Sequence, residues 1–257
     1  MAGVVRRSIL PLLAVGLLVG PPALAAHRGP SLPSDVPAPA RARLAAVTTE
    51  AALAVRVDGQ PFVARPEVFE YLLDHPELAT HVTRELRVAR YRIWKTPEGL
   101  AIDDGWGTVG TFQVVHAGPR TRVMHARGVY QQSILPDIRG EAVVVIDYEP
   151  SPAPEGGTVI ATSVGGFVKL DSGILSLVSR LASAVARAKG EQEAHRLVKV
   201  FAKATRAIEA DPSGLCDRLE RRPDVPAAEL EEFRRLLSAS AGGDRDHREA
   251  RIPASRR

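Results

Sequence analysis

The middle of this sequence is a long run of short extended segments with no helical pattern between them. Glycine, proline or aspartate separates each segment from the next, as antiparallel strands joined by tight turns require. In the clearest segment Ala142, Val144, Ile146 and Tyr148 alternate with other residues, so one side of that strand is apolar. The expected strands are 88–94, 100–103, 108–116, 122–130, 141–149 and 158–170. The run predicts a curved antiparallel sheet with one buried face.

Other patterns stand on both sides of this run. Before it, residues 53–57 alternate as a first strand, and short helices are expected to begin at Pro66 and Pro76. After it, an apolar stripe with steps of three and four predicts a long closing helix. The stripe consists of Ile174, Val178, Leu181, Val185 and Ala188. The next apolar set lies nearly opposite it, so we expect a break or kink at Gly190. The fold class predicted is α+β.

The N-terminus has the order of a secretory signal peptide. Arg6 and Arg7 precede an apolar stretch at 9–19, and the small residues Ala23-Leu24-Ala25 follow. The apolar stretch is shorter than the roughly 20 residues that a membrane-spanning helix needs. We therefore expect residues 1–25 to be cleaved and the protein to be periplasmic or secreted, with an uncleaved anchor as the alternative. No later segment is predicted to cross a membrane.

Composition divides the remainder of the chain. Residues 26–45 are rich in proline and alanine and are interpreted as a flexible linker, and 46–210 as the main domain. Residues 211–240 are predicted to form a C-terminal helical appendage, with a short helix around 227–237, and 241–257 a disordered tail. The single cysteine, Cys216, cannot form an intramolecular disulfide, so stability has to come from the core.

Charge and motifs exclude several function classes. The formal net charge of +4 includes Arg6 and Arg7 and shows no dense basic block, so a nucleic-acid partner is not expected. The sequence has no Gly-x-Ser-x-Gly elbow, no His-Glu-x-x-His pair, no phosphate-binding glycine loop and no paired-cysteine zinc spacing. We therefore assign no catalytic residue, metal ligand or cofactor, and we lean against an enzyme.

The element order resembles that of the START-like helix-grip superfamily, also called SRPBCC. A first strand, two short helices, an antiparallel strand run and a long closing helix occur in this order between 53 and 208. The segment 68–76, VFEYLLDHP, is similar to the helix and turn where bacterial members commonly place an aspartate and a proline. The break expected at Gly190 and the extra segment around Cys216 depart from the pattern. The resemblance implies a bent sheet gripping a long helix, with an apolar cavity that holds lipids, sterols or similar molecules.

Residues lining such a cavity have to lie on the concave face of the sheet or on the inner stripe of the closing helix. The larger candidates are Tyr91, Ile93, Trp106, Phe112, Tyr130, Tyr148, Phe167, Leu175, Val178 and Leu181, with Ile146 as a further member. A filled core uses the same residue types, so plain packing is the alternative for each. Trp106 lies between Gly105 and Gly107 and either gates a pocket or caps the core.

Some polar side chains have two readings as well. Arg90, Arg92, Arg122 and Arg127 are expected on strands, where they either bind a carboxylate or phosphate head group or form a solvated sheet face. His116 and His125 flank a turn and could approach each other, but two histidines without a third ligand make a poor metal site.

The function predicted is that of an exported binding or carrier protein for a hydrophobic small molecule such as a lipid. One alternative is an enzyme similar to polyketide cyclases and aromatases, with Asp103 or Asp147 acting on the substrate. The other is a cell-envelope module whose sheet edge or C-terminal helices bind a protein partner. A cavity favours the first two readings, and paired titratable groups facing that cavity favour the enzyme.

Overall fold

The computed structural model describes residues 30–132, 135–171 and 180–249. In this part the chain forms one antiparallel sheet of eight strands, with neighbours in the order β1-β8-β7-β6-β5-β4-β3 and with β2 also paired to β8. The strands are β1 (Leu53–Asp58), β2 (Phe62–Val63), β3 (Arg92–Thr96), β4 (Gly99–Asp103), β5 (Thr108–Gly118), β6 (Thr121–Gln132), β7 (Leu135–Pro152) and β8 (Thr158–Leu170). The predicted antiparallel run is confirmed, although the strand expected at 88–94 begins only at Arg92.

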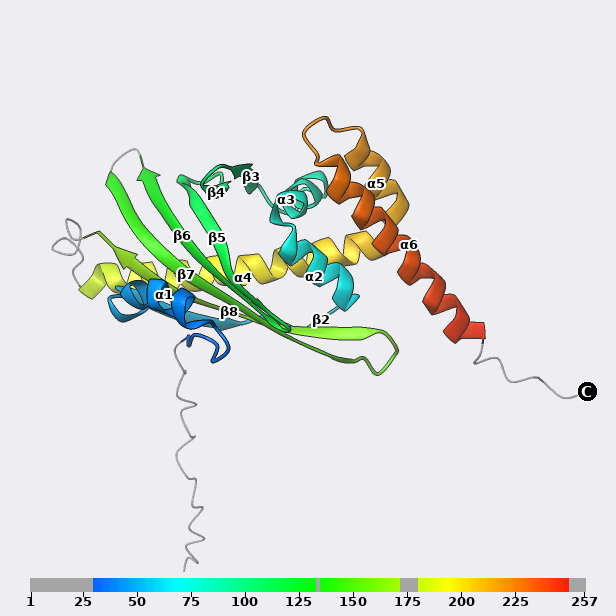
Figure 1. The fold of residues 1–257 in the computed structure, drawn as a ribbon, viewed down its shortest axis with the longest axis horizontal. Coiled ribbons are helices and arrows are strands. Elements are labelled where there is room, and N and C mark those ends of the chain that lie inside the picture. The colour runs from blue at the N-terminus through cyan, green and yellow to red at the C-terminus, as the bar shows by residue number, and fades with distance from the viewer. Residues whose placement is uncertain (1–29, 133–134, 172–179, 250–257) are drawn as a thin grey trace, which may run out of the picture.

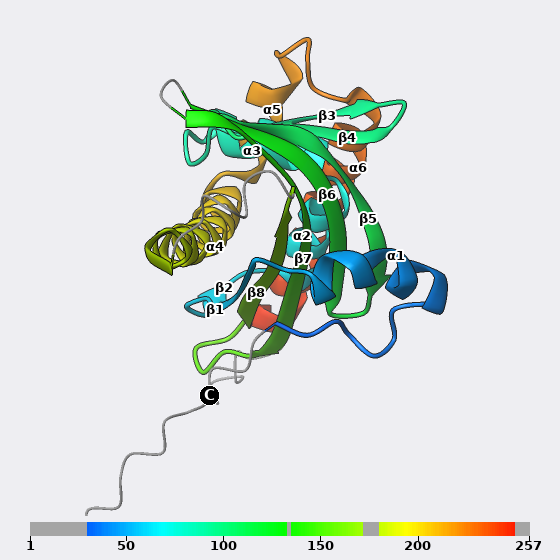
Figure 2. The ribbon, with the colours of Figure 1, turned by 90° about the vertical axis from the view of Figure 1, so that its left-hand side faces the viewer.

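The helices are α1 (Ala38–Thr49), α2 (Pro66–Asp74), α3 (Pro76–Glu85), α4 (Arg180–Ala210), α5 (Pro212–Glu220) and α6 (Ala227–Glu249). The long helix α4 lies inside the curve of the sheet, and α1 lies on its outer side (Figures 1 and 2). The helices α2, α3, α5 and α6 gather at one end. The fold class is therefore α+β, with a curved sheet gripping a long helix as predicted. Within the described residues, no helix combines the length and the apolar character that crossing a bilayer requires.

One half of the concave face is filled by side chains. Ile146 and Val164 are cross-strand partners, and they belong to the same buried cluster as Val198 of α4. Phe69 of α2 lies at the centre of this cluster, with its ring centroid 5.2 Å from Tyr148 and 5.3 Å from Phe201. Burying these rings removes apolar area from water and fixes α2 and the C-terminal part of α4 on the sheet.

The convex face is covered by α1, which corrects the prediction of a flexible linker at 26–45. Leu44 and Val47 of α1 are fully buried, and they pack in one cluster with Val143 and Phe167 of the sheet. The Arg41 guanidinium donates a hydrogen bond to the Pro33 carbonyl over 2.8 Å and so fixes the segment before the helix. The composition hid this helix because its buried residues are only Ala40, Leu44 and Val47 in a segment otherwise rich in alanine, arginine and proline.

The closing helix runs without a break through Gly190, contrary to the kink that we predicted. A Cβ at Gly190 would lie 3.3 Å from Leu53 and 3.6 Å from Val55. The glycine therefore serves close packing of α4 on β1 and does not interrupt the helix. Ile174 and Val178 of the predicted stripe lie outside the described residues, and so do the side chains of Leu181, Val185 and Ala188.

The C-terminal segment packs on α2 and α3. Leu215, Cys216 and Leu219 of α5 and Phe233 of α6 are buried against Leu78 of α3. Burial raises the pKa of the Cys216 thiol, which keeps the sulfur protonated and unreactive. The helix α6 continues to Glu249, beyond the 227–237 that we expected, so the part of the predicted disordered tail up to that residue is helical. Gly242 and Gly243 lower helix propensity by about 1 kcal/mol each without ending it.

A row of glycines crosses the curved part of the sheet. Gly110 of β5 pairs with Gly128 of β6, which pairs with Gly140 of β7. A Cβ would lie 2.3 Å from the Arg127 carbonyl oxygen at Gly110 and 2.5 Å from the Lys169 carbonyl oxygen at Gly140. No side chain fits at such distances, so the row marks a place where neighbouring strands approach closely while the sheet bends.

Candidate functional site

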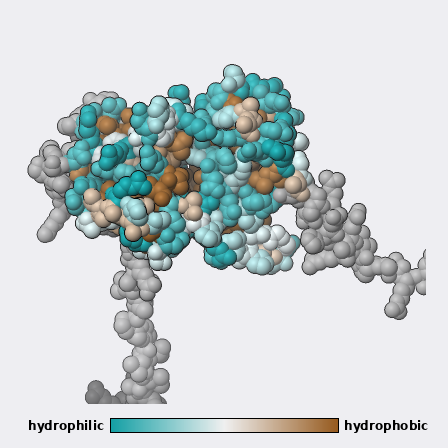
Figure 3. Space-filling view, in the orientation of Figure 1, coloured by the Kyte–Doolittle hydropathy of each residue, from teal (hydrophilic) through white to brown (hydrophobic). Residues whose placement is uncertain are grey.

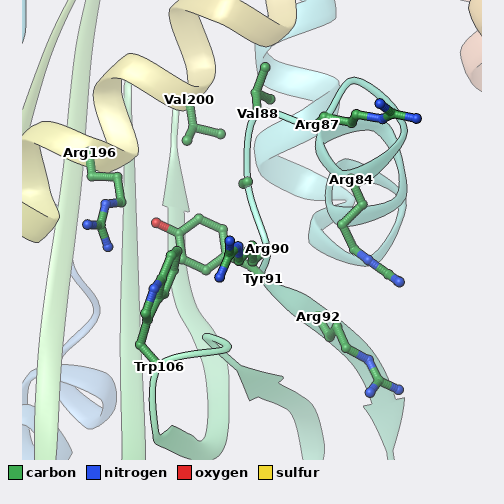
Figure 4. Close-up of a pocket in the computed structure, with 10 residues that line it drawn as sticks. Arg84, Arg87, Val88, Arg90, Tyr91, Arg92, Trp106, Arg196 and Val200 are labelled. Carbon is green, nitrogen blue, oxygen red and sulfur yellow. The ribbon is translucent and has the colours of Figure 1, made fainter.

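A cavity of about 620 Å³ lies where α3, the segment leading to β3, the β4–β5 turn and α4 meet (Figure 4). Its charged lining is entirely arginine, and two aromatic side chains, Tyr91 and Trp106, stand among these arginines. The arginines are Arg84, Arg87, Arg90, Arg92 and Arg196. We call this site the arginine pocket.

The end of α3 supplies two of the pocket's five arginines, Arg84 and Arg87. The Val88 N–H donates to the Thr83 carbonyl over 2.9 Å, and the Arg87 N–H donates to the Arg84 carbonyl over 3.0 Å. These two bonds form a Schellman motif, in which the residue at the position of Arg87 takes a left-handed backbone. Arg87 has φ of +55°, and it is the only residue other than glycine with positive φ in the described part of the chain. The motif turns the chain out of α3 and explains why β3 begins later than predicted.

The β4–β5 turn holds Trp106 in place. The Asp104 carboxylate accepts hydrogen bonds from the N–H groups of Trp106 (2.7 Å) and Thr108 (2.9 Å). Gly105 and Gly107, on either side of the indole, have φ of +74° and +107°, which residues with a side chain rarely adopt. The two glycines and Asp104 therefore fix the direction of the Trp106 side chain.

Trp106 contacts two of the arginines. The guanidinium carbon of Arg196 lies 4.5 Å from the indole centroid and that of Arg90 lies 5.9 Å from it, both within the range of cation–π attraction. Figure 4 shows these two arginines on opposite sides of the indole. The Tyr91 ring meets Trp106 edge-on at 6.0 Å, and burial raises the pKa of its phenol. The hydroxyl of Tyr91 points toward α4 (Figure 4).

The arginine pocket has an excess of positive charge. Arg196 pairs with Glu193 at 3.0 Å, and Arg84 lies 4.0 Å from Asp224. Arg87, Arg90 and Arg92 are exposed, and none of them forms an ion pair with a carboxylate of the described residues. These three arginines can therefore bind an anionic group without first breaking an ion pair.

The predicted ligand-binding residues divide into several groups. Tyr91 and Trp106 line the arginine pocket. Ile93, Phe112 and Tyr130 share the concave face, because their cross-strand partners lead to Gly140, Ala142 and Ile138 of β7, which alternate onto the same side of that strand as Ile146. Phe112 is buried, whereas Ile93 and Tyr130 are half-buried.

The remaining predicted residues do not join the pocket. Tyr148 lies on the concave face inside the packed cluster around Phe69. Phe167 faces the other way and packs against α1, so its assignment to the concave face was wrong. The parity of β8 places Val164, and not Phe167, opposite Ile146. Leu175 and Val178 lie outside the described residues, as does the Leu181 side chain.

The part of the concave face next to the arginine pocket differs from the packed part. Ile93, Ile102 and Tyr130 carry apolar side chains on this face and are only half-buried, whereas Met124 packs against the cluster around Phe69. Figure 3 shows the opposite side of the molecule, where α1 covers the sheet and apolar patches lie among hydrophilic residues. Uncovered apolar surface beside a charged pocket is typical of a binding site.

Arg122 is not part of a solvated sheet face, which corrects one of the two readings that we gave it. Its guanidinium is buried and donates two hydrogen bonds to Asp74, over 2.6 Å and 2.9 Å. The neighbouring Tyr148 hydroxyl donates to Glu70 over 2.9 Å, and burial is the main cause that raises the pKa of Tyr148 to about 12. These groups join α2 to the sheet and have a structural role.

The other polar candidates lie apart from the arginine pocket. Arg127 pairs with Glu141 at 3.2 Å, and His125 lies 2.8 Å from the same carboxylate. His116 lies 3.1 Å from Asp35, so the two histidines bind different carboxylates and are not brought together. Among the described residues, no group of three or more histidine, cysteine or acidic side chains could hold a metal ion.

The two carboxylates proposed for catalysis do not converge. Asp147 pairs with Arg56 at 3.2 Å and accepts a hydrogen bond from Thr121 at 2.8 Å. It alternates with Ile146 along β7 and therefore points to the convex side. Asp103 accepts the Gly105 N–H over 2.8 Å and so helps to build the turn.

The exposed side of α4 carries a second basic surface. A hollow of about 1080 Å³ follows it beside the β1–β2 connection, and its lining includes His195, Lys199, Lys203 and Arg206. Asp58 and Glu191 also line this hollow. It is a mixed, polar surface, and it lacks the paired aromatic residues of the arginine pocket.

No protein-family model matches this chain, and no curated protein matches it. Among solved structures, a conserved protein from Geobacillus kaustophilus is 13% identical with a TM-score of 0.39, covering 62% of this chain and 97% of its own. Ara h 8.0201 is 14% identical with a TM-score of 0.34, covering 62% and 98%. The di-domain ARO/CYC StfQ of the steffimycin biosynthetic pathway is 14% identical with a TM-score of 0.33, covering 66% and 55%. At these identities and TM-scores, the three structures do not assign this chain to a family or a function.

Proposed function

We propose that this chain is an exported binding or carrier protein for a hydrophobic small molecule such as a lipid, and that its domain is START-like. The ligand would lie between the concave face of the sheet and α4. The observation that carries this proposal is the set of half-buried apolar side chains on that face beside the arginine pocket, Ile93, Ile102 and Tyr130. Each Å² of apolar ligand surface that leaves water there would contribute about 25 cal/mol.

A binding function is favoured over a cyclase-like enzyme by the positions of the carboxylates. Catalysis by general acids and bases needs titratable groups that converge on one substrate. Asp103 belongs to a turn and Asp147 to the convex side, where each is already hydrogen-bonded. The acidic side chains near Tyr91 are Asp104, which holds the β4–β5 turn, and Glu193, which pairs with Arg196.

The proposal is tested by native mass spectrometry on the protein purified from the periplasm of an expressing bacterium, followed by organic extraction. We expect a stoichiometric apolar molecule on the wild-type protein. Ala126→Phe places a ring on the concave face and should abolish its retention, because the new side chain occupies the same space. The control is Val109→Phe, which adds the same bulk at an exposed position on the convex side. A clean apo mass together with no binding to a panel of envelope lipids would contradict the carrier function.

Export is tested separately by N-terminal sequencing of the periplasmic protein. Cleavage at the small residues Ala23-Leu24-Ala25 should give a mature chain that begins at Ala26 or His27. An intact Met1 on a membrane-bound fraction would instead show an uncleaved anchor.

A further inference from the structure

We propose that the ligand is an amphipathic anion, whose carboxylate or phosphate head is bound by the arginine pocket. This inference rests on the proposed carrier function and names the class of ligand. The arginines come from α3, from the segment between α3 and β3, from the first residue of β3 and from α4, so the fold brings Arg196 to one pocket with charges that are distant from it in the sequence. The positive charges that line one pocket repel one another, and a bound anion would offset that repulsion.

The local charge balance favours an anion even when every nearby carboxylate is counted. Glu193 is engaged by Arg196, and Asp224 lies near Arg84. Asp104 also lies near Tyr91, but one of its oxygens already accepts two backbone N–H groups of the turn. Arg87, Arg90 and Arg92 form no ion pair with a described carboxylate, and the guanidinium groups of Arg90 and Arg92 lie over the rings of Trp106 and Trp94. A guanidinium presents paired N–H groups whose geometry matches both carboxylate and phosphate.

Arg87 provides an independent reason to assign a function to this charge. A side chain with left-handed φ is strained, and glycine is the usual residue at this position of a Schellman motif. The chain nevertheless has an arginine there, and this arginine lines the pocket. Strain of this kind is typical of functional sites, where a side chain is needed for binding and not for stability.

The position of the pocket explains why the anion should carry an apolar tail. Tyr91 in the pocket and Ile93 on the concave face are two residues apart and therefore lie on the same side of an extended chain. Ile93 pairs with Ile102 of β4, which is also half-buried. A head held by Arg196 and Arg90, whose guanidinium groups lie over Trp106, would place its tail along these apolar side chains, with Trp106 and Tyr91 at the boundary.

The experiment compares three probes by calorimetric titration of the delipidated full-length protein recovered from the periplasm. The probes are palmitate, the uncharged hexadecanol and inorganic phosphate. We expect palmitate to bind at least about tenfold more tightly than hexadecanol, because a charge-assisted hydrogen bond is worth about one order of magnitude in affinity. Phosphate alone should bind weakly.

Two variants and a control locate the effect. Arg87→Gly and Arg90→Ala should each weaken palmitate binding about tenfold and leave hexadecanol binding unchanged. Glycine suits the backbone at position 87, so a loss of binding in that variant cannot be attributed to loss of fold, and a thermal melt checks this. Lys203→Ala removes one positive charge from exposed α4 outside the arginine pocket and should change neither affinity.

Each outcome decides between the two proposals. Equal affinity for palmitate and hexadecanol would overturn the anionic head and leave the carrier function intact. Phosphate binding as tight as palmitate binding, lost in Arg87→Gly, would support an anion site but overturn the amphipathic ligand and the carrier function. Binding of neither long-chain probe would contradict the carrier function and this inference with it.

Discussion

The two parts of the concave face differ in how tightly their side chains pack and in how much charge they carry. Around Phe69 the rings of Phe62, Tyr148 and Phe201 meet edge-on, and the central ring is fully buried. At the arginine pocket the indole of Trp106 is 39% exposed, and the guanidinium groups of Arg90 and Arg196 lie over it. The comparison shows that stability is concentrated in one part, which leaves the other part free to carry strain, charge and uncovered apolar surface.

The largest difference between these two parts should appear when an aromatic ring is removed from each. Phe69→Ala should lower the free energy of unfolding by about 3–5 kcal/mol, because it leaves a cavity in a filled cluster. Trp106→Ala should lower it by no more than about 1 kcal/mol, since the indole is partly exposed and bounds an existing cavity. Urea titrations measure both. Similar losses would mean that the arginine pocket is as important for stability as the packed cluster.

The next effect concerns the buried polar group beside the packed cluster. Asp74→Ala leaves the Arg122 guanidinium without its carboxylate, and we expect a loss of about 2 kcal/mol in the free energy of unfolding. Glu149→Ala is the control, because Arg120 and Glu149 form an exposed pair that should contribute less than about 1 kcal/mol. If the two variants are equally stable, the pair of Asp74 and Arg122 does not fix α2 on the sheet.

A smaller effect of opposite sign is expected at the arginine pocket. Arg87→Gly should raise the free energy of unfolding by about 1 kcal/mol, because glycine takes the left-handed backbone without strain. Arg84→Gly is the matched control inside the right-handed part of α3, where glycine should cost about 1 kcal/mol. Thermal melts of the two variants should therefore shift in opposite directions. A lower melting temperature for Arg87→Gly would show that Arg87 is placed there for stability.

The smallest effect is confined to acidic pH and tests the packed side of α3. Burial lowers the pKa of His81 below its ordinary 6.5, and Asp224 opposes this shift only in part. The unfolded chain therefore binds a proton more readily, so the contribution of neutral His81 to stability is complete above pH 6.5 and is lost as pH falls toward the folded pKa. Glu77, Arg84 and Arg222 also act on this group.

The measurement is the free energy of unfolding between pH 7.5 and pH 5, compared with that of His81→Gln. The variant should lose less stability than the wild type over this range, because its side chain does not titrate. Equal slopes for the two proteins would rule out His81 as a source of the acid sensitivity.

The strands were predictable because one physical pattern dominates them. Ala142, Val144, Ile146 and Tyr148 alternate with other residues without interruption, and turn-forming residues bound each segment. Helix α1 was missed because its buried side consists largely of Ala40, Leu44 and Val47 among alanine, arginine and proline, which gives little apolar contrast. Gly190 was misread because a glycine in a helix signals either a break or close packing, and only the neighbouring strand decides.

The candidate site was predictable only in pieces. Tyr91 was selected as an aromatic residue on the concave face of an expected strand and Trp106 as one between two glycines of a turn. Arg90 and Arg92 were given two readings, as binders of a head group or as part of a solvated sheet face. Arg87 carries no signal in the sequence, because its left-handed backbone arises from the way α3 ends. Arg196 lines the same pocket but comes from α4, which follows the sheet in the sequence. No local sequence pattern predicts a contact between residues so far apart in the chain.

The glycine row across β5, β6 and β7 has a consequence for how the binding site can change over time. Since neither Gly110 nor Gly140 has room for a side chain, the curvature of the sheet cannot be adjusted at this row by ordinary substitution. Variation in ligand preference is then restricted to the side chains that stand on a backbone of fixed shape. The arginines could be exchanged one at a time for other residues, while the hollow proposed to receive a ligand would keep its outline.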